Sequence, residues 1–95
     1  ASPNPFIVEA RFVGNVLFRY QQDDLPAEER YFGSGDVLQT SVERAIRVWA
    51  SNAGHVRFRA AGRDVNLGSL GDVVVWQIQY RQLDGEYRLE VVPVY

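Results

Sequence analysis

The chain has 95 residues, of which 46% are hydrophobic and 13% aromatic, and it carries a formal net charge of -2 at pH 7. That length suits one folded domain, and the apolar content is too high for a disordered chain. The absence of cysteine excludes disulfides, a thiolate nucleophile and zinc–thiolate sites, while the net charge gives the whole molecule no attraction for nucleic acid or an anionic membrane.

Apolar residues alternate with polar ones along most of the chain, which is the period of a β-strand with one buried face. The first two strands are expected at residues 6–12 and 16–21. The polar stretch of residues 22–30 is expected to form a loop, and a short strand follows at residues 31–32.

The second half of the chain is also expected to be extended. Within residues 41–49 the apolar positions fit helical spacing as well, so a helical turn is the alternative there, although extended structure is favoured. Pro93 lacks a backbone donor, so its end of the last strand is expected at a sheet edge or outside the sheet. The strands predicted in this half are residues 37–42, 46–50, 56–60, 65–67, 74–81 and 87–91.

Five residues are expected to form turns between these strands. Asn52 and Gly54 lie in the connection that follows residue 50, and Gly62 turns the chain again. Asp84 and Gly85 form a strong two-residue hairpin signal, because a type I′ turn needs positive φ at both central positions and these residue types tolerate it.

Together these elements predict an all-β fold: an antiparallel β-sandwich, Ig-like or small barrel-like, of about eight or nine short strands. Residues 1–5 are expected to be the end of a linker, and residues 6–95 a single domain. No apolar run approaches the roughly 18–20 residues that a membrane-spanning helix needs.

The titratable residues match no known catalytic or metal-binding spacing. His55 is the only histidine and starts the polar face of a strand, so an ordinary position beside a turn is expected for it. A hydrolase would need Asp23, Asp24, Asp64 and Asp72 to cluster in a cleft, and their spacing matches no calcium loop. We therefore expect no catalytic residue, no metal and no cofactor.

One surface has the composition of a binding site. If residues 46–50 and 56–60 pair across the turn between them, the face opposite the core carries an indole among basic side chains. An indole flanked by guanidiniums can stack on a sugar ring or base while it pairs with an anionic group. The alternative is that the indole covers a second sheet layer while the arginine heads remain in water. The residues of this candidate face are Arg47, Trp49, His55, Arg57 and Arg59.

The run IRVWASNAGHVRF at residues 46–58, followed by residues 61–68 and 71–73, resembles the C-terminal domain of RodZ-like bacterial proteins. The likeness covers most of residues 7–80 and is carried by turn formers, so it implies no catalytic residue. It implies a full-length protein with a cytoplasmic helix-turn-helix domain, one transmembrane helix, a Pro-rich linker and this β domain. The β domain would then lie on the periplasmic or extracytoplasmic side of the inner membrane.

The sequence and the resemblance predict a non-enzymatic extracytoplasmic interaction domain of a membrane-anchored RodZ-like protein involved in cell shape or envelope organisation. Its expected partner is an envelope or wall-synthesis protein, met through an exposed strand edge or the face around Trp49. The alternative is a carbohydrate-binding module that holds peptidoglycan. This domain itself is expected to bind no nucleic acid, and to meet the membrane only through an upstream anchor.

Overall fold

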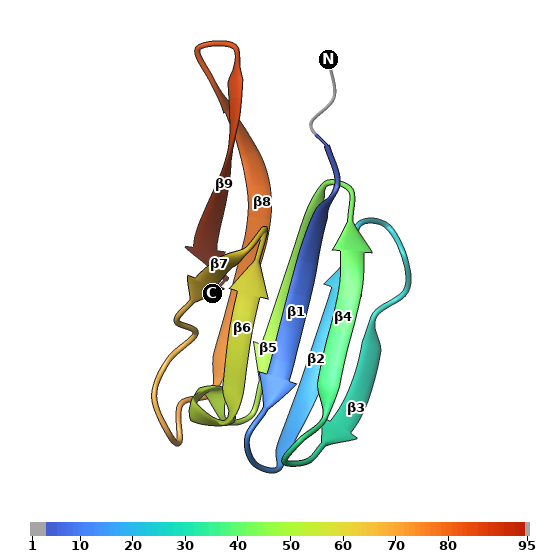
Figure 1. The fold of residues 1–95 in the computed structure, drawn as a ribbon, viewed down its shortest axis with the longest axis vertical. Coiled ribbons are helices and arrows are strands. Elements are labelled where there is room, and N and C mark those ends of the chain that lie inside the picture. The colour runs from blue at the N-terminus through green and yellow to red at the C-terminus, as the bar shows by residue number, and fades with distance from the viewer. Residues whose placement is uncertain (1–3, 95) are drawn as a thin grey trace.

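Within residues 4–94, which the computed structural model describes, the chain forms nine strands in two antiparallel sheets that face each other (Figure 1). The predicted antiparallel β-sandwich is therefore confirmed. The predicted linker end at residues 1–5 lies mostly outside the described residues. The strands are β1 (Phe6–Phe12), β2 (Val16–Gln22), β3 (Glu28–Phe32), β4 (Val37–Val42), β5 (Ala45–Ala50), β6 (Val56–Ala60), β7 (Arg63–Val65), β8 (Val74–Leu83) and β9 (Glu86–Pro93).

Helical structure in residues 4–94 is limited to one 3-10 turn, η1 (Ala53–His55), between β5 and β6. Residues 41–49 are extended apart from a bend at Glu43 and Arg44, so the helical alternative for that segment is wrong. No helix in the described part of the chain has the length and apolar composition needed to span a membrane.

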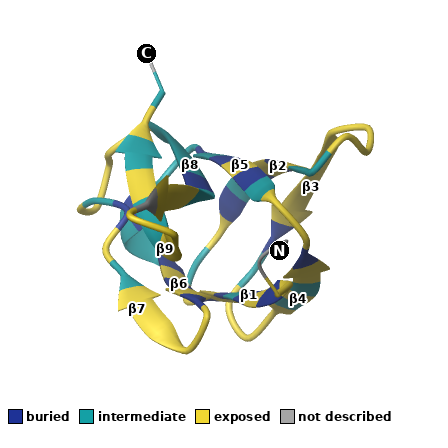
Figure 2. Cartoon of the chain, turned by 90° about the horizontal axis from the view of Figure 1, so that it is seen from above, coloured by how far each residue is buried: buried dark blue, intermediate teal, exposed yellow. Residues whose placement is uncertain are grey.

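The two sheets are built from strands that are mostly not neighbours in the sequence. The four-stranded sheet has the order β4-β1-β6-β7, and the five-stranded sheet has the order β3-β2-β5-β8-β9. Only β2–β3, β6–β7 and β8–β9 are hairpins within one sheet, so every other connection crosses between the sheets. Seen from one end, the two sheets face each other, and buried positions occur along strands of both layers (Figure 2). Pro93 lies in an edge strand, as its missing N–H predicts.

The core consists of the apolar residues that alternate along the strands. Every second residue of β1, β5 and β6, and of β2 as far as Tyr20, faces the other sheet and is buried. Three phenylalanines fill one part of it: the rings of Phe12 and Phe32 stack with centroids 4.1 Å apart, and Phe18 meets Phe12 edge-on at 5.4 Å. Burying such a ring contributes roughly 1.5–3 kcal/mol relative to leaving it exposed, so these rings are a large part of a small core.

Strand β3 begins earlier than the sequence predicts. The polar composition indicates a loop through Arg30, but the chain pairs with β2 from Glu28, opposite Tyr20, through Arg30, opposite Phe18. The Tyr20 hydroxyl donates a hydrogen bond to the Glu28 carboxylate. Because β3 is an edge strand whose charged side chains still reach water, its polarity is compatible with pairing and protects the open edge.

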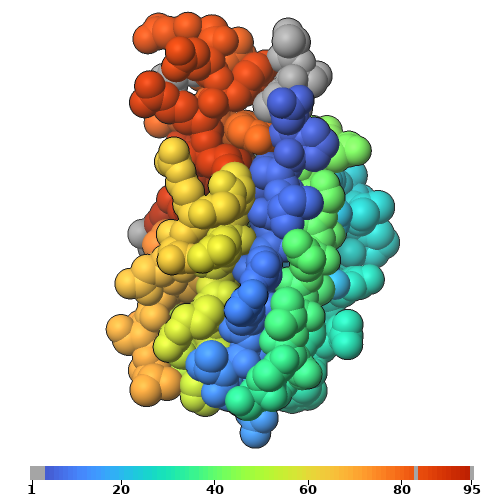
Figure 3. All heavy atoms as spheres, viewed as in Figure 1, coloured from blue at the N-terminus to red at the C-terminus, as the bar shows by residue number. Residues whose placement is uncertain are grey.

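The β8–β9 hairpin extends beyond the end of the sandwich. β8 pairs with β5 only from Val74 to Gln79, whereas β9 accompanies β8 as far as Leu83. Near the point of departure, Tyr80 packs edge-on against Phe6 with ring centroids 5.3 Å apart. In Figure 3 the outer face of the four-stranded sheet is toward the viewer, and the tip of the hairpin, in orange and red, stands past it.

Candidate binding face

The structure divides the predicted polar face between the two sheets. β5, which carries Arg47 and Trp49, belongs to the five-stranded sheet, whereas β6, which carries Arg57 and Arg59, belongs to the four-stranded sheet. The outer faces of the two sheets lie on opposite sides of the sandwich, so the two pairs of side chains do not meet. The predicted pairing of these two strands is wrong, because the chain between them crosses from one sheet to the other.

Hydrogen bonds hold this crossing segment at the end of the sandwich. The Ser51 N–H donates to the Leu17 carbonyl at 3.0 Å, and the Leu17 N–H donates to Ser51 Oγ at 2.9 Å. The segment therefore stays beside β2 after β5 has ended. The predicted turn residue Asn52 then accepts the Gly71 N–H at 2.9 Å through Oδ1, which ties the crossing to the loop before β8.

His55 supports the connection between β1 and β2 instead of joining Trp49. Its Nδ1 lies 2.9 Å from the carbonyl oxygen of Asn15, and since a carbonyl only accepts, Nδ1 carries the proton. The ring lies directly against Gly14, where an added Cβ would be 2.6 Å from Nδ1. This contact explains a glycine at residue 14 and gives His55 a packing role.

The other predicted turn residues lie where the chain reverses. Ala61 and Gly62 join β6 to β7 with φ values of 52° and 78°, and Asp84 and Gly85 join β8 to β9 with 49° and 80°. Positive φ at both central residues is the type I′ geometry whose twist matches that of the flanking strands. Gly54 is needed for another reason, the close approach of the Leu70 backbone, which belongs to the loop before β8.

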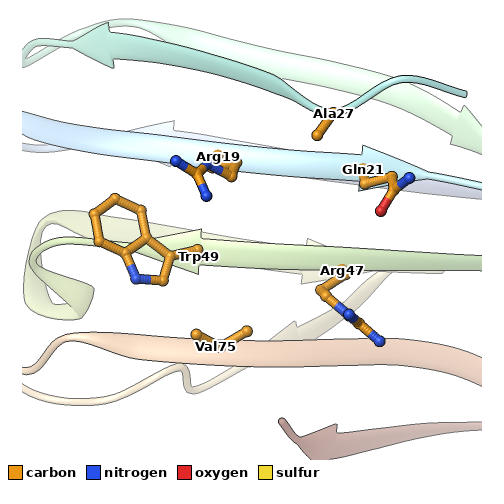
Figure 4. A pocket seen from close by; sticks show the side chains of 6 residues that line it. All are labelled: Arg19, Gln21, Ala27, Arg47, Trp49 and Val75. Carbon is orange, nitrogen blue, oxygen red and sulfur yellow. The ribbon is translucent and has the colours of Figure 1, made fainter. Parts of the chain in front are cut away.

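The outer face of the five-stranded sheet is hollowed around Trp49, and we call this surface the Trp49 face. The hollow has a volume of about 300 Å³. Figure 4 shows the indole broadside on the sheet, with Arg19 on one side of it and Val75 on the other. The residues that line the hollow are Arg19, Gln21, Ala27, Arg47, Trp49 and Val75.

Arg19 lies beside Trp49 because β2 pairs with β5 in that register. The guanidinium carbon of Arg19 is 5.8 Å from the centroid of the indole, within the range of a cation–π contact. Its Nη2 also lies 2.6 Å from the Glu29 carboxylate, which is opposite Arg19 on β3. The positive charge of Arg19 is therefore largely compensated within the face.

Arg47 occupies the next cross-strand row, between Gln21 of β2 and Gln77 of β8. Its Nε and Nη2 donate to Gln77 Oε1 at 3.3 and 3.0 Å. Among the carboxylates of residues 4–94, none lies within 4.0 Å of the Arg47 guanidinium. The hollow therefore holds a positive charge that only a neutral amide accompanies, on the same strand as the indole.

The opposite face, on the four-stranded sheet, has a different character. Arg59 Nε lies 3.1 Å from Asp64, and Arg11 pairs with Glu9. Arg57 donates to a backbone carbonyl at 3.2 Å. Both tryptophans of the chain belong to the five-stranded sheet. Paired charges without an indole are typical of a solvated sheet surface. Arg57 and Arg59 therefore fit the alternative interpretation of the predicted face, in which the guanidinium groups stay in water.

The carboxylates named for a hydrolase do not cluster. Asp23 and Asp24 follow β2, Asp64 lies in β7 and Asp72 precedes β8. Asp24 and Asp64 pair with arginines, and Asp72 accepts a backbone N–H from its own loop at 2.8 Å. In the described part of the chain, no three histidine, aspartate or glutamate side chains come together in a way that could hold a metal ion.

Asp23 fastens the bend between β4 and β5. Its carboxylate accepts the backbone N–H groups of Glu43, Arg44 and Ala45 at 3.1, 2.7 and 3.2 Å. Partial burial alone would raise the pKa of Asp23, but these hydrogen bonds and the nearby Arg44 guanidinium outweigh it and lower the pKa below its usual range. The side chain therefore holds two sheets together at their shared end, because β4 and β5 belong to different sheets.

The Asp23→Asn variant is expected to lose about 1 kcal/mol of unfolding free energy near pH 7, since an amide accepts these bonds without the negative charge. A carboxylate whose folded-state pKa is depressed stabilises the fold above its unfolded-state pKa, and this contribution is lost as the pH falls through the folded-state pKa. Urea unfolding of both proteins at a series of pH values should show their difference shrinking below about pH 4. A difference independent of pH would contradict this role.

Four residues that line the Trp49 face are missing from the sequence prediction, Arg19, Gln21, Ala27 and Val75, and so is Gln77, the hydrogen-bond partner of Arg47. The alternation already places Arg19, Gln21 and Gln77 on outward faces. What the sequence does not supply is the neighbour relation between β2, β5 and β8, which brings them beside Arg47.

Comparison of the chain with protein-family models, with curated proteins and with solved structures finds no match. The fold and the face define the class: a nine-stranded antiparallel β-sandwich with an aromatic and basic hollow on its five-stranded sheet. The resemblance to RodZ-like domains stays a prediction.

Proposed function

We propose that this chain is a non-enzymatic interaction domain that binds its partner through the Trp49 face. The observation that carries the proposal is that Trp49 and Arg47 both line the hollow of this face. Both lie on β5, the middle strand of the five-stranded sheet, where β2 and β8 fix the backbone from both sides. Tryptophan and arginine at the centre of a surface are the residue types that most often dominate binding energy.

The resemblance supports a cellular setting for this domain. In the proposed setting, the domain stands on the extracytoplasmic side of the inner membrane as part of a membrane-anchored RodZ-like protein, and it contributes to cell shape or envelope organisation. The run at residues 46–58 that carries the resemblance includes all of β5 except its first residue, and Arg47 and Trp49 project from that strand. The partner is accordingly a component of the cell envelope.

The proposal is tested by paired substitutions on the two outer faces. The variant Arg47→Gln/Trp49→Ala is expected to lose about tenfold or more of the purified domain's retention on an envelope fraction from the cell that makes the protein. Sedimentation of the domain with that fraction, followed by quantification of the pellet, measures the retention.

The matched control is Arg57→Gln/Arg59→Gln, which removes two arginines from the opposite face and should leave retention within about twofold. Circular dichroism checks that each variant is folded. Equal retention of both variants, or a loss confined to the control, would contradict binding through the Trp49 face.

A further inference from the structure

We infer that the ligand of the Trp49 face is an oligosaccharide that carries carboxylate groups. The inference rests on the proposed function, because it names the chemical class that the same face would bind. Three properties of the face lead to it: the ring surface of Trp49, the guanidinium of Arg47 on the same strand, and side-chain amides on both sides of Arg47.

The indole supplies the ring surface. Trp49 is partly exposed and is seen broadside on the sheet in Figure 4, with Val75 beside it in the same cross-strand row. One side of a pyranose ring presents C–H groups, which form an apolar surface with a slight positive polarity. The face of an indole is apolar and carries negative π-density, so the two surfaces are complementary.

Arg47 supplies the charge that would select an acidic sugar. Two of its nitrogen atoms donate to Gln77 Oε1, and the remaining N–H groups on Nη1 and Nη2 form an edge that matches the two oxygens of a carboxylate. Trp49 lies two residues further along β5, so the Cα atoms of the two residues are about 7 Å apart. Figure 4 shows the two side chains turned away from each other along β5, which suits a sugar ring on the indole and a carboxylate on a neighbouring ring of the same oligosaccharide.

The polar groups around the pair fit hydroxyl groups better than they fit a phosphate chain. Gln21 and Gln77 flank Arg47, and an amide both donates to and accepts from a hydroxyl. Glu29 neutralises the charge of Arg19, so the guanidinium of Arg47 is the one that the face offers to a ligand. A nucleic-acid backbone requires several uncompensated basic residues, and the net charge of -2 opposes it. The volume of about 300 Å³ is at the lower end of small-ligand sites, which fits one or two sugar rings.

The test uses the two indole N–H signals in a ¹⁵N NMR spectrum. Two acidic probes are titrated into the ¹⁵N-labelled domain: a trigalacturonate, and soluble peptidoglycan glycan strands whose peptides have been removed to expose the lactyl carboxylates. Each probe is matched by its methyl-esterified, uncharged form. The Trp49 signal should shift with at least one acidic probe, while the Trp76 signal should remain in place because its Nε1 donates to the Leu67 carbonyl inside the fold.

The expected order of affinities follows from the roles of the side chains. Arg47→Gln should weaken binding of the acidic probe about tenfold and leave the esterified probe unaffected, whereas Trp49→Ala should weaken both. Arg59→Gln, on the opposite face, should stay within about twofold. Trp49→Phe serves as a second variant in case Trp49→Ala does not fold.

Failure of the inference and failure of the proposed function give different results. No shift of the Trp49 signal at millimolar concentrations of both acidic probes, or equal binding of charged and esterified probes, overturns the inference. If envelope retention still depends on Trp49 and Arg47 in that case, the proposed function stands and the partner is a protein. If retention is also independent of these residues, the proposed function is overturned as well.

Discussion

Replacing Phe18 with alanine is expected to lower the free energy of unfolding by about 4 kcal/mol. Phe18 is completely buried on β2, and its ring centroid lies 5.4 Å from that of Phe12 and 6.2 Å from that of Phe32. Phe12 comes from the opposite sheet. The cavity left by Phe18 would therefore be bounded by rings that two separate hydrogen-bonded sheets hold in place, and it could collapse only partly.

Urea unfolding followed by circular dichroism measures this loss. The control is Tyr31→Ala on the neighbouring strand β3, where the side chain is 81% exposed, and its expected cost is less than about 1 kcal/mol. The total stability of a domain of this size is about 5–15 kcal/mol, so Phe18→Ala removes a large share of it. If both variants cost the same, Phe18 does not have the packing role assigned to it.

Replacing Gly54 with alanine is expected to destabilise the domain by about 2–3 kcal/mol, although only one methyl group is added. The new Cβ would lie 2.5 Å from both N and Cα of Leu70. These are backbone atoms, so the loop before β8 would have to move as a whole. That movement would break the hydrogen bonds from the Gly54 N–H to the Ser69 carbonyl and from the Gly71 N–H to Asn52 Oδ1.

Thermal unfolding of Gly54→Ala is best compared with Gly33→Ala. At Gly33 the nearest atom to an added Cβ is Asn15 Oδ1 at 3.4 Å, an ordinary contact, so this substitution should change stability by about 0.5 kcal/mol or less. Similar melting temperatures for the two variants would mean that the loop containing Leu70 can move at little cost in stability. A glycine at residue 54 would then not be required.

The strands were predictable because each has one buried and one exposed face. On β1 and β6, the residues that alternate as apolar in the sequence are those that are buried in the structure. The turn at Asp84 and Gly85 was predictable because few residue types tolerate positive φ. Where a strand has no buried face along most of its length, as at Glu28–Arg30, the periodicity disappears, and the sequence predicts a loop.

The neighbours of each strand were not predictable, and this is why only part of the candidate face was identified correctly. Alternation shows that Trp49 and Arg57 point away from the core, but a sandwich has two outer faces. Which face a residue occupies depends on pairing between distant segments, such as Arg19 with Trp49 and Arg11 with Arg57. A short connection between two strands suggests a hairpin, and the crossing at residues 51–55 has the same length and composition as one.

The same network of crossings has a consequence for the speed of folding. β1 is made first during synthesis, yet its partners β4 and β6 come much later, and Val8 pairs with Ala60 across more than half of the chain. Closing such long loops lowers the entropy of the chain before the stabilising contacts between these strands can form. Folding in milliseconds to seconds is therefore expected, as for other β-sandwiches. Until β6 is present, one backbone edge of β1 stays unpaired, and in that interval the chain is most exposed to misassembly.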